Sequence, residues 1–253
     1  MVSSNSPVHG FRQLCTMCVF FCFVFGAEWA ESQEPIQWSV TPYIWASDTK
    51  VDLTLRDESL GGDEISFKDL LDTLDSAFMI NVEGGRGHWS LFGDLTYLET
   101  SDSNERTLLV IDTNSKQTVL DTGVAYWPNG VGSRLSLIGG LRYSGFEDRY
   151  TFSFDDTPIS KQRNSNDYYD ALLGVRYRFD MSERWSLLTR ADFSFGDSEG
   201  TFLLRANFAY TVGKRQQNRI LFGYQYKQAE FQDGDLTTDF SYQGPTAGFS
   251  FRW

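Results

Sequence analysis

The last nine residues, Pro245 to Trp253, read P-T-A-G-F-S-F-R-W and alternate between apolar and small or polar side chains. The apolar parity holds Ala247, Phe249, Phe251 and Trp253. The opposite parity ends at the cation Arg252. A period of two is that of a β-strand. Because chain termini are usually loose and solvated, a soluble protein seldom ends on an apolar strand with an aromatic as its final residue.

Similar alternation recurs along the chain before this strand. The stretches that carry it lie at 37–47, 77–84, 89–99, 107–127, 134–154, 168–179, 185–195, 202–212 and 219–230, and the last strand covers 237–253. Single-chain bacterial membrane barrels have an even number of strands. The pattern therefore predicts an all-β fold, a transmembrane antiparallel up-and-down β-barrel of about ten strands, with eight or twelve as alternatives.

The connections between these strands differ in length. Short turns are expected at 85–88, 128–133 and 180–184, and longer ones at 48–76, 100–106 and 155–166. The last two connections, 213–218 and 231–236, are similar in length. Because short turns of such barrels face the periplasm, we expect both termini there. In the first long loop, Ser66 and Asp69 are spaced to cap a short helix over 66–74.

The N-terminus has the pattern of a signal peptide. His9 and Arg12 precede an apolar segment from Leu14 to Gly26, which is too short to span a membrane as a helix. We expect residues 1–30 to be the signal peptide and residues 31–253 the barrel, with an uncleaved anchor as the alternative. All three cysteines lie in the first segment, at 15, 18 and 22. The mature chain would then have no disulfide and no thiolate metal site.

Composition limits the classes of function. Aromatic residues make up 16% of the 253 residues, yet mean hydropathy is below zero. This combination suits a barrel with an apolar outside and a polar inside. The formal charge of −12 argues against a nucleic-acid partner. Acidic residues gather between the candidate strands, where they are expected to form solvated loops or, alternatively, a cation-dependent contact with lipopolysaccharide.

Aromatic residues gather at the strand ends. Membrane barrels place aromatics at both membrane interfaces. We therefore expect an interface girdle made of Trp89, Tyr97, Tyr126, Trp127, Tyr143, Tyr177, Trp185 and Tyr210.

The parity opposite the apolar face carries charged residues, which would be very unfavourable on a lipid face. The expected lumen charges are Glu83, Asp94, Asp121, Arg142, Asp170, Arg176, Arg178, Arg190, Asp192, Arg205, Lys227 and Arg252. Arg190 with Asp192, and Asp170 with Arg176, are candidate pairs on single strands. We expect an ion-paired network that fills the lumen. The alternative is a charged constriction that favours anions, since cations outnumber acids.

Catalytic signatures are absent from the sequence after residue 30. Its one histidine, His88, falls in a predicted turn on the periplasmic side. That position excludes a Ser-His or Asp-His arrangement at the outer mouth. The sequence has no glycine-rich phosphate loop and no histidine and glutamate cluster with metal-ligand spacing. We therefore expect no enzymatic activity, no cofactor and no metal.

Several motifs resemble known outer-membrane proteins. The C-terminal stretch resembles the final strand that the barrel assembly machinery recognises. W-S-V-T-P-Y-I-W-A-S (38–47), S-F-K-D-L-L-D-T-L-D (66–75) and W-S-L-F-G-D-L-T-Y-L (89–98) resemble segments of a proteobacterial family of outer-membrane β-barrels of unknown function. The resemblance implies a barrel in the outer membrane and carries over no catalytic residue.

These observations predict an integral outer-membrane barrel with a structural role or a narrow channel for small solutes. A soluble periplasmic β-sandwich or lipocalin-like binder is one alternative, and a surface adhesion or interaction barrel is another. The expected partners are outer-membrane lipid, lipopolysaccharide and the assembly machinery, and we expect a monomer.

Overall fold

The computed structural model describes residues 35–56, 58–106, 109–154, 157–213 and 217–253. Residues Ile36–Trp253 form one compact unit. The predicted signal peptide, 1–30, lies outside the described residues. Among those residues, no helix is long and apolar enough to cross a membrane.

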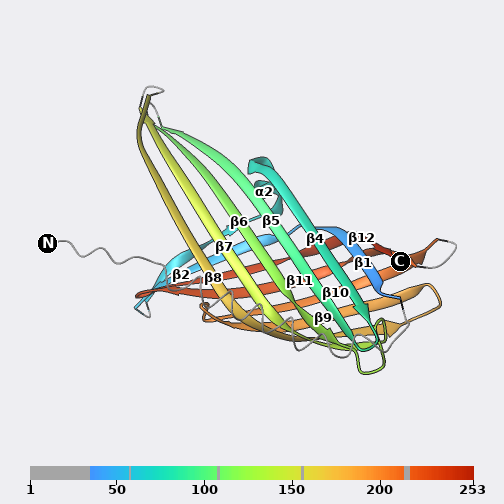
Figure 1. The fold of residues 1–253 in the computed structure, drawn as a ribbon. Coiled ribbons are helices and arrows are strands. Elements are labelled where there is room, and N and C mark those ends of the chain that lie inside the picture. The colour runs from blue at the N-terminus through green and yellow to red at the C-terminus, as the bar shows by residue number, and fades with distance from the viewer. Residues whose placement is uncertain (1–34, 57, 107–108, 155–156, 214–216) are drawn as a thin grey trace. The chain divides into compact units, whose positions relative to one another are not determined.

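A single antiparallel sheet closes on itself in the described part of the chain (Figure 1). Its closed part has ten strands: β1 (Gln37–Trp45), β4 (Leu74–Arg86), β5 (Trp89–Arg106), β6 (Leu109–Tyr126), β7 (Leu135–Phe154), β8 (Thr157–Asp180), β9 (Trp185–Gly196), β10 (Gly200–Val212), β11 (Asn218–Asp233) and β12 (Leu236–Arg252). Each strand pairs with its neighbours in chain order, apart from the hairpin described below. The predicted ten-stranded up-and-down barrel is confirmed.

The C-terminal stretch closes the barrel. In β12, Ala247 pairs with Ile44 and Phe251 pairs with Val40 of β1. Two further backbone hydrogen bonds join Trp253 to Trp38, at 2.9 and 3.1 Å. β1 also pairs with β4 on its other side. The first and last strands therefore leave no free edge along this length. Strands in lipid must be paired on both sides, because their backbone groups find no water there to bond with.

The connection 48–76 contains two strands that the sequence pattern did not indicate. β2 (Asp48–Leu55) pairs with the first half of β12, and β3 (Glu58–Ile65) pairs with β2. β12 is longer than β1, so its part before Thr246 offers an edge that β2 completes. The sequence of β3, E-S-L-G-G-D-E-I, has no apolar alternation and is exposed throughout. Pairing with a neighbour, rather than burial of one face, forms this strand.

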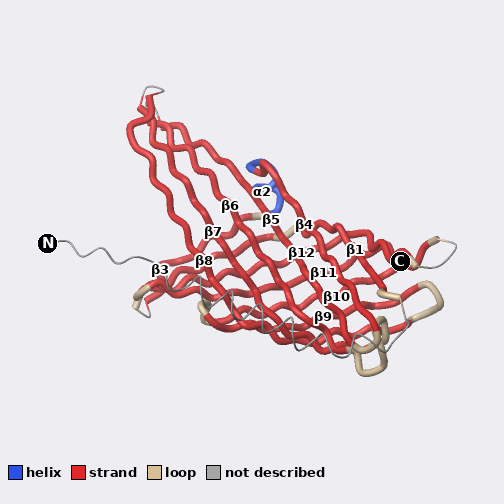
Figure 2. The backbone as a smooth tube through the Cα atoms, viewed as in Figure 1, coloured by secondary structure: helices blue, strands red, loops and turns tan. Residues whose placement is uncertain are grey.

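The predicted short helix follows this hairpin. α2 (Phe67–Thr73) begins after Ser66, whose hydroxyl accepts a hydrogen bond from the backbone N–H of Asp69 at 3.2 Å. This contact is the N-terminal cap that the sequence spacing predicts. Figure 2 shows α2 as the one helix beside a backbone that is otherwise almost entirely strand in the described residues.

The stretches 100–106 and 157–166 were expected as loops and are strands instead. They extend β5 and β8, and β6 and β7 run beside them, so that these four strands rise well beyond the others (Figure 1). Polar pairs continue the ladder there, such as Thr100 with Ser115 and Asp148 with Asn164. Outside the membrane both faces of a strand can be wet, so the apolar alternation ends although the backbone pairing does not.

The barrel is apolar outside and polar inside. Leu91, Leu141 and Leu173 point outward and are each more than half exposed. Buried polar groups include Ser90, Asp94, Asp121, Ser136, Arg142, Asp170, Arg190, Asp192, Gln225 and Lys227. A soluble sandwich or lipocalin-like protein would expose the polar face and bury the apolar one. That alternative is therefore wrong, and the fold is that of an outer-membrane β-barrel.

Candidate functional site: the charged barrel interior

The two ends of the barrel differ in the elements that they carry. The terminal end holds the start of β1, the end of β12 and the turns 87–88, 127–134 and 181–184. The loop end holds α2, the β2–β3 hairpin and the tips of the long strands β5–β8.

At mid-height Arg142 of β7 lies at the centre of an ion-paired cluster. Its Nε and Nη2 donate to the two carboxylate oxygens of Asp121 on β6 at 2.7 and 2.8 Å. Nη2 also donates to Asp192 Oδ1 on β9 at 2.8 Å. The Arg142 side chain is only 1% exposed. A buried guanidinium is tolerated when its charge and its donors are both matched, as they are here.

Arg190 of β9 extends this cluster across the lumen. It pairs with Asp192 at 2.6 Å, with Asp121 at 2.7 Å and with Asp94 of β5 at 3.3 Å. Arg205 of β10 reaches the same Asp94 oxygen at 3.4 Å. We call these six residues the central ion-pair network: Asp94, Asp121, Arg142, Arg190, Asp192 and Arg205. Three acids match three arginines, and five strands contribute, so the network bridges the barrel interior.

The two candidate same-strand pairs have different outcomes. Arg190 does pair with Asp192, two residues away on one face. Asp170 does not pair with Arg176; its carboxylate accepts from the backbone N–H and hydroxyl of Ser198 and from the hydroxyl of Ser194. Six residues along a strand are separated by about 20 Å, which is too far for contact. Asp170 thus holds the β9–β10 turn, and the expected pairing is wrong.

An aromatic cluster fills the barrel toward the loop end. It consists of Phe146, Tyr168, Phe231, Phe240 and Tyr242, from β7, β8, β11 and β12. Ring centroids lie 4.5 Å apart for Tyr168–Phe231 and 5.3 Å for Phe146–Phe231. Lys227 lies 6.0 Å from the Tyr242 ring. This cluster was not predicted, although Phe146, Tyr168, Phe240 and Tyr242 fall on the inward parities of their predicted strands. Phe231 falls in the connection that was expected at 231–236.

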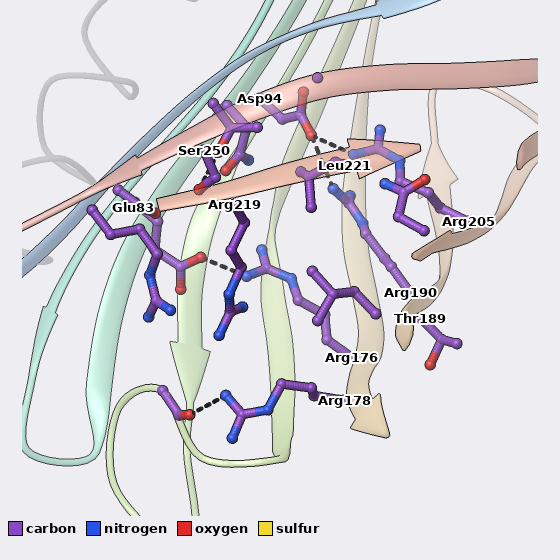
Figure 3. Close-up of a pocket in the computed structure, with 18 of the residues that line it drawn as sticks. Glu83, Asp94, Arg176, Arg178, Thr189, Arg190, Arg205, Arg219, Leu221 and Ser250 are labelled. Carbon is purple, nitrogen blue, oxygen red and sulfur yellow. Dashed lines mark hydrogen bonds and ion pairs between the residues drawn. The ribbon is translucent and has the colours of Figure 1, made fainter. Parts of the chain in front are cut away.

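At the terminal end lies a cavity of about 240 Å³. Arg176 pairs there with Glu83 across the barrel at 2.8 Å. Arg178 pairs with Asp180 at 2.8 Å and donates to the Gly132 carbonyl at 2.7 Å. Arg252 and Arg219 also line the cavity, with the central network at its inner limit (Figure 3). Arg219 has the inward parity of β11 but was not among the predicted lumen charges.

Most of the predicted girdle lies on the outer face. Near the terminal end, Trp89 packs on Tyr126 with ring centroids 4.9 Å apart, and Trp185 packs on Tyr210 at 4.8 Å. The ring centroids of Tyr177 and Phe179 lie 4.4 Å apart. Toward the loop end, those of Tyr143 and Tyr169 lie 5.2 Å apart. Tyr97 donates to Glu99 at 2.7 Å. The ring centroids of the C-terminal aromatics Phe249 and Phe251 lie 4.6 Å apart, and the Trp253 side chain is exposed.

Trp127 is an exception, because its side chain is inside the barrel. Its indole N–H donates to the Ser90 hydroxyl at 2.9 Å, and the ring packs on the small buried apolar cluster around Phe92. Consecutive residues of an extended chain point to opposite faces. Tyr126 faces outward, so Trp127 turns inward and does not belong to the girdle.

Glu99 and Lys116 form an ion pair beyond the membrane-spanning part of β5 and β6, with 2.7 Å between Lys116 Nζ and Glu99 Oε1. Hydrogen bonds from Lys116, and then from Tyr97, lower the pKa of the Glu99 carboxyl to about 2. Neither this pair nor the central network offers a metal site; the described residues contain no cluster of histidine, cysteine and carboxylate ligands suited to one.

No family model and no curated protein matches the sequence. Solved structures resemble it in fold. Ail of Yersinia pestis is 12% identical, with 87% of this chain and 100% of that chain covered and a TM-score of 0.38. The Escherichia coli outer-membrane protease OmpT is 11% identical, with 88% and 99% covered and a TM-score of 0.47. The translocator domain of the autotransporter NalP from Neisseria meningitidis is 9% identical, with 94% and 96% covered and a TM-score of 0.33.

Proposed function

We propose that this outer-membrane barrel has a structural role and is closed to solutes. The observation that carries the proposal is the central ion-pair network, in which Arg142 and Arg190 connect three carboxylates from three strands. A solute crossing the barrel would have to separate these pairs. Removing a partner from a buried ion pair is costly, on the order of 3–5 kcal/mol. The aromatic cluster adds a second obstruction toward the loop end.

The proposal includes an orientation and a set of partners. The terminal end faces the periplasm, because it carries the short turns, the start of β1 and the end of β12. The partners are membrane lipid, lipopolysaccharide and the assembly machinery, and the barrel acts as a monomer. The motifs at 38–47, 66–75 and 89–98 support membership of the proteobacterial outer-membrane barrel family that they resemble.

We also propose that the barrel is not an enzyme. His88 lies in the β4–β5 turn, where its Nδ1 is 2.8 Å from the Trp127 carbonyl oxygen. Arginines hold all three acids of the central network, and Asp94 also accepts a hydrogen bond from the Tyr43 hydroxyl at 2.7 Å. A carboxylate in bidentate contact with a guanidinium is a poor general base, because its charge is already neutralised.

A narrow channel for small solutes is the second candidate. Arginines outnumber acids in the cavity at the terminal end, which would favour anions. In this case the central network would open transiently.

A surface-interaction barrel is a further alternative. The strands β5–β8 extend far beyond the others at the loop end, so they present a broad polar sheet outside the membrane.

Single-channel conductance in planar bilayers tests the proposal. We expect the wild-type protein to give no steps above noise. A matched variant, Arg190→Ser with Asp192→Ser, removes one acid and one base from the network while preserving net charge. We expect it to give small steps if the network is what closes the barrel. Regular steps from the wild-type protein would reject the closed barrel in favour of the narrow channel.

A further inference from the structure

The cavity at the terminal end has an excess of cationic side chains. Arg176, Arg178, Arg219 and Arg252 line it, and Glu83 is the acid on the same part of its wall. Figure 3 shows Arg176, Arg178 and Arg219 extending into the same space. A volume of about 240 Å³ is sufficient for a small ligand. This part of the interior differs from the central network, where acids and bases balance.

Two of these arginines have no acid partner among the described residues. Glu83 is occupied by Arg176 at 2.8 Å, and Arg178 is held by Asp180 at 2.8 Å. Arg219 and Arg252 form no ion pair within the described part of the chain. Like charges in a partly buried space repel each other more strongly than in water. The cavity therefore holds two uncompensated positive charges.

Buried hydrogen-bond donors in the same cavity also lack acceptors. Arg219 Nε, Arg176 Nη2 and Ser133 Oγ are buried, and no described residue accepts from them. A buried donor without an acceptor costs free energy, and the cost is larger for a charged group. Arg176, Arg219 and Ser133 all line the cavity. These donors are suited to a ligand that brings negative charge and several acceptor oxygens together.

We propose that this cavity binds a phosphate-class oxyanion. A tetrahedral oxyanion presents several acceptor oxygens to guanidinium groups, which bind such groups through paired N–H donors. Arg219 and Arg252 supply the unmatched charge, and Arg176 supplies a free donor while it keeps its contact with Glu83. The phosphate group can come from a free periplasmic anion or from the headgroup of a lipid. The inference does not rest on the closed barrel, because the ligand enters and leaves at the terminal end.

Calorimetric titration of the detergent-solubilised full-length barrel with inorganic phosphate, at constant chloride, is the test. We expect measurable binding to the wild-type protein. Arg219→Gln with Arg252→Gln should weaken binding by about tenfold or more, since each removes a charged donor. Arg149→Gln with Arg163→Gln is the matched control, because it removes the same two positive charges from exposed sites near the loop end and should not change the affinity. Heat-modifiable migration on a gel verifies that each variant is folded.

A second arm separates the two sources of phosphate. The barrel is placed in lipid nanodiscs of phosphatidylcholine, with or without phosphatidic acid, and titrated again with inorganic phosphate. Weaker binding in the presence of phosphatidic acid indicates that a lipid headgroup competes for the cavity, and unchanged binding indicates a free anion. Absence of phosphate binding by the wild-type barrel, or equal affinity in the Arg219 and Arg252 double variant, overturns the proposal.

Discussion

At the scale of single residues, the inward arginines fall into three groups. Arg142 and Arg190 are almost fully buried and each contacts at least two acids. Arg176, Arg178 and Arg205 have one acid each, and Arg219 and Arg252 have none among the described residues. Side chains with the same chemistry therefore have different roles, and the local balance of charge decides between them.

Replacing Arg142 with alanine should destabilise the barrel by about 3–5 kcal/mol, because Asp121 and Asp192 would lose a buried partner. Urea unfolding in lipid vesicles measures the change. Arg163→Ala, which removes an arginine that is 61% exposed, is the control and should cost less than about 1 kcal/mol. Similar losses in the two variants would mean that the central network contributes no special stability.

Glu99 gives a prediction about pH. Its pKa in the folded barrel is about 2, below the usual value of a glutamate, because Lys116 and Tyr97 donate to the carboxylate. The ion pair should stabilise the fold fully above about pH 4.3, the ordinary pKa of a glutamate. The contribution should be lost as the pH falls toward 2. NMR titration of the carboxyl carbon measures the pKa, and Lys116→Gln should raise it; an unchanged pKa in that variant would exclude Lys116 as the main cause.

At the scale of elements, the strands within the membrane and the long strands β6 and β7 could be predicted from the sequence. The β2–β3 hairpin and the extensions of β5 and β8 beyond the membrane could not. Lipid on one side and a packed lumen on the other impose a strict alternation, as in Leu135–Leu141 of β7. In β3, in 100–106 of β5 and in 157–166 of β8 most residues on both faces are polar, so nothing in the sequence distinguishes a strand from a loop. The contact of Arg190 with Asp192 within β9 was predicted. The pairs between different strands of the central network were beyond prediction, because they depend on the register between strands. Trp127 was misassigned because the strand-end position was given more weight than its parity.

Trp253 has a specific structural role in the closing element. Its backbone exchanges hydrogen bonds with Trp38, and its side chain is exposed on the outer face. Deleting Trp253 should sharply lower membrane insertion, because it removes both the closing bonds and the terminal aromatic. Trp253→Phe keeps both features and serves as the control. The folded fraction is measured by heat-modifiable migration, and normal assembly of the deletion variant would contradict this role.

The β2–β3 hairpin should be dispensable for closure. Its described residues pair with 236–243 of β12, the part before Thr246, and take no part in the β1–β12 contact. Replacing residues 49–64 with a short glycine and serine linker should therefore leave a folded, heat-modifiable barrel. Loss of the folded band would show that the hairpin is needed to bring β1 and β12 together.

At the scale of the whole molecule, the interior has three levels. The aromatic cluster lies toward the loop end, the central ion-pair network lies at mid-height, and the arginine-lined cavity lies at the terminal end. A small cavity of about 70 Å³ reaches from the network toward Tyr242 of the aromatic cluster. We propose that the two ends of the barrel do not communicate and that the terminal end faces the periplasm.

Side-specific labelling of single cysteines tests this claim most directly. Ser39→Cys introduces a thiol that lines the cavity at the terminal end, and Arg163→Cys introduces one near the loop end. Cys15, Cys18 and Cys22 are replaced so that no other thiol can react. We expect a membrane-impermeant maleimide added to intact cells to label the cysteine at 163 and not the one at 39, which should react only after the periplasm is opened. Labelling of both cysteines in intact cells would contradict a closed barrel in this orientation.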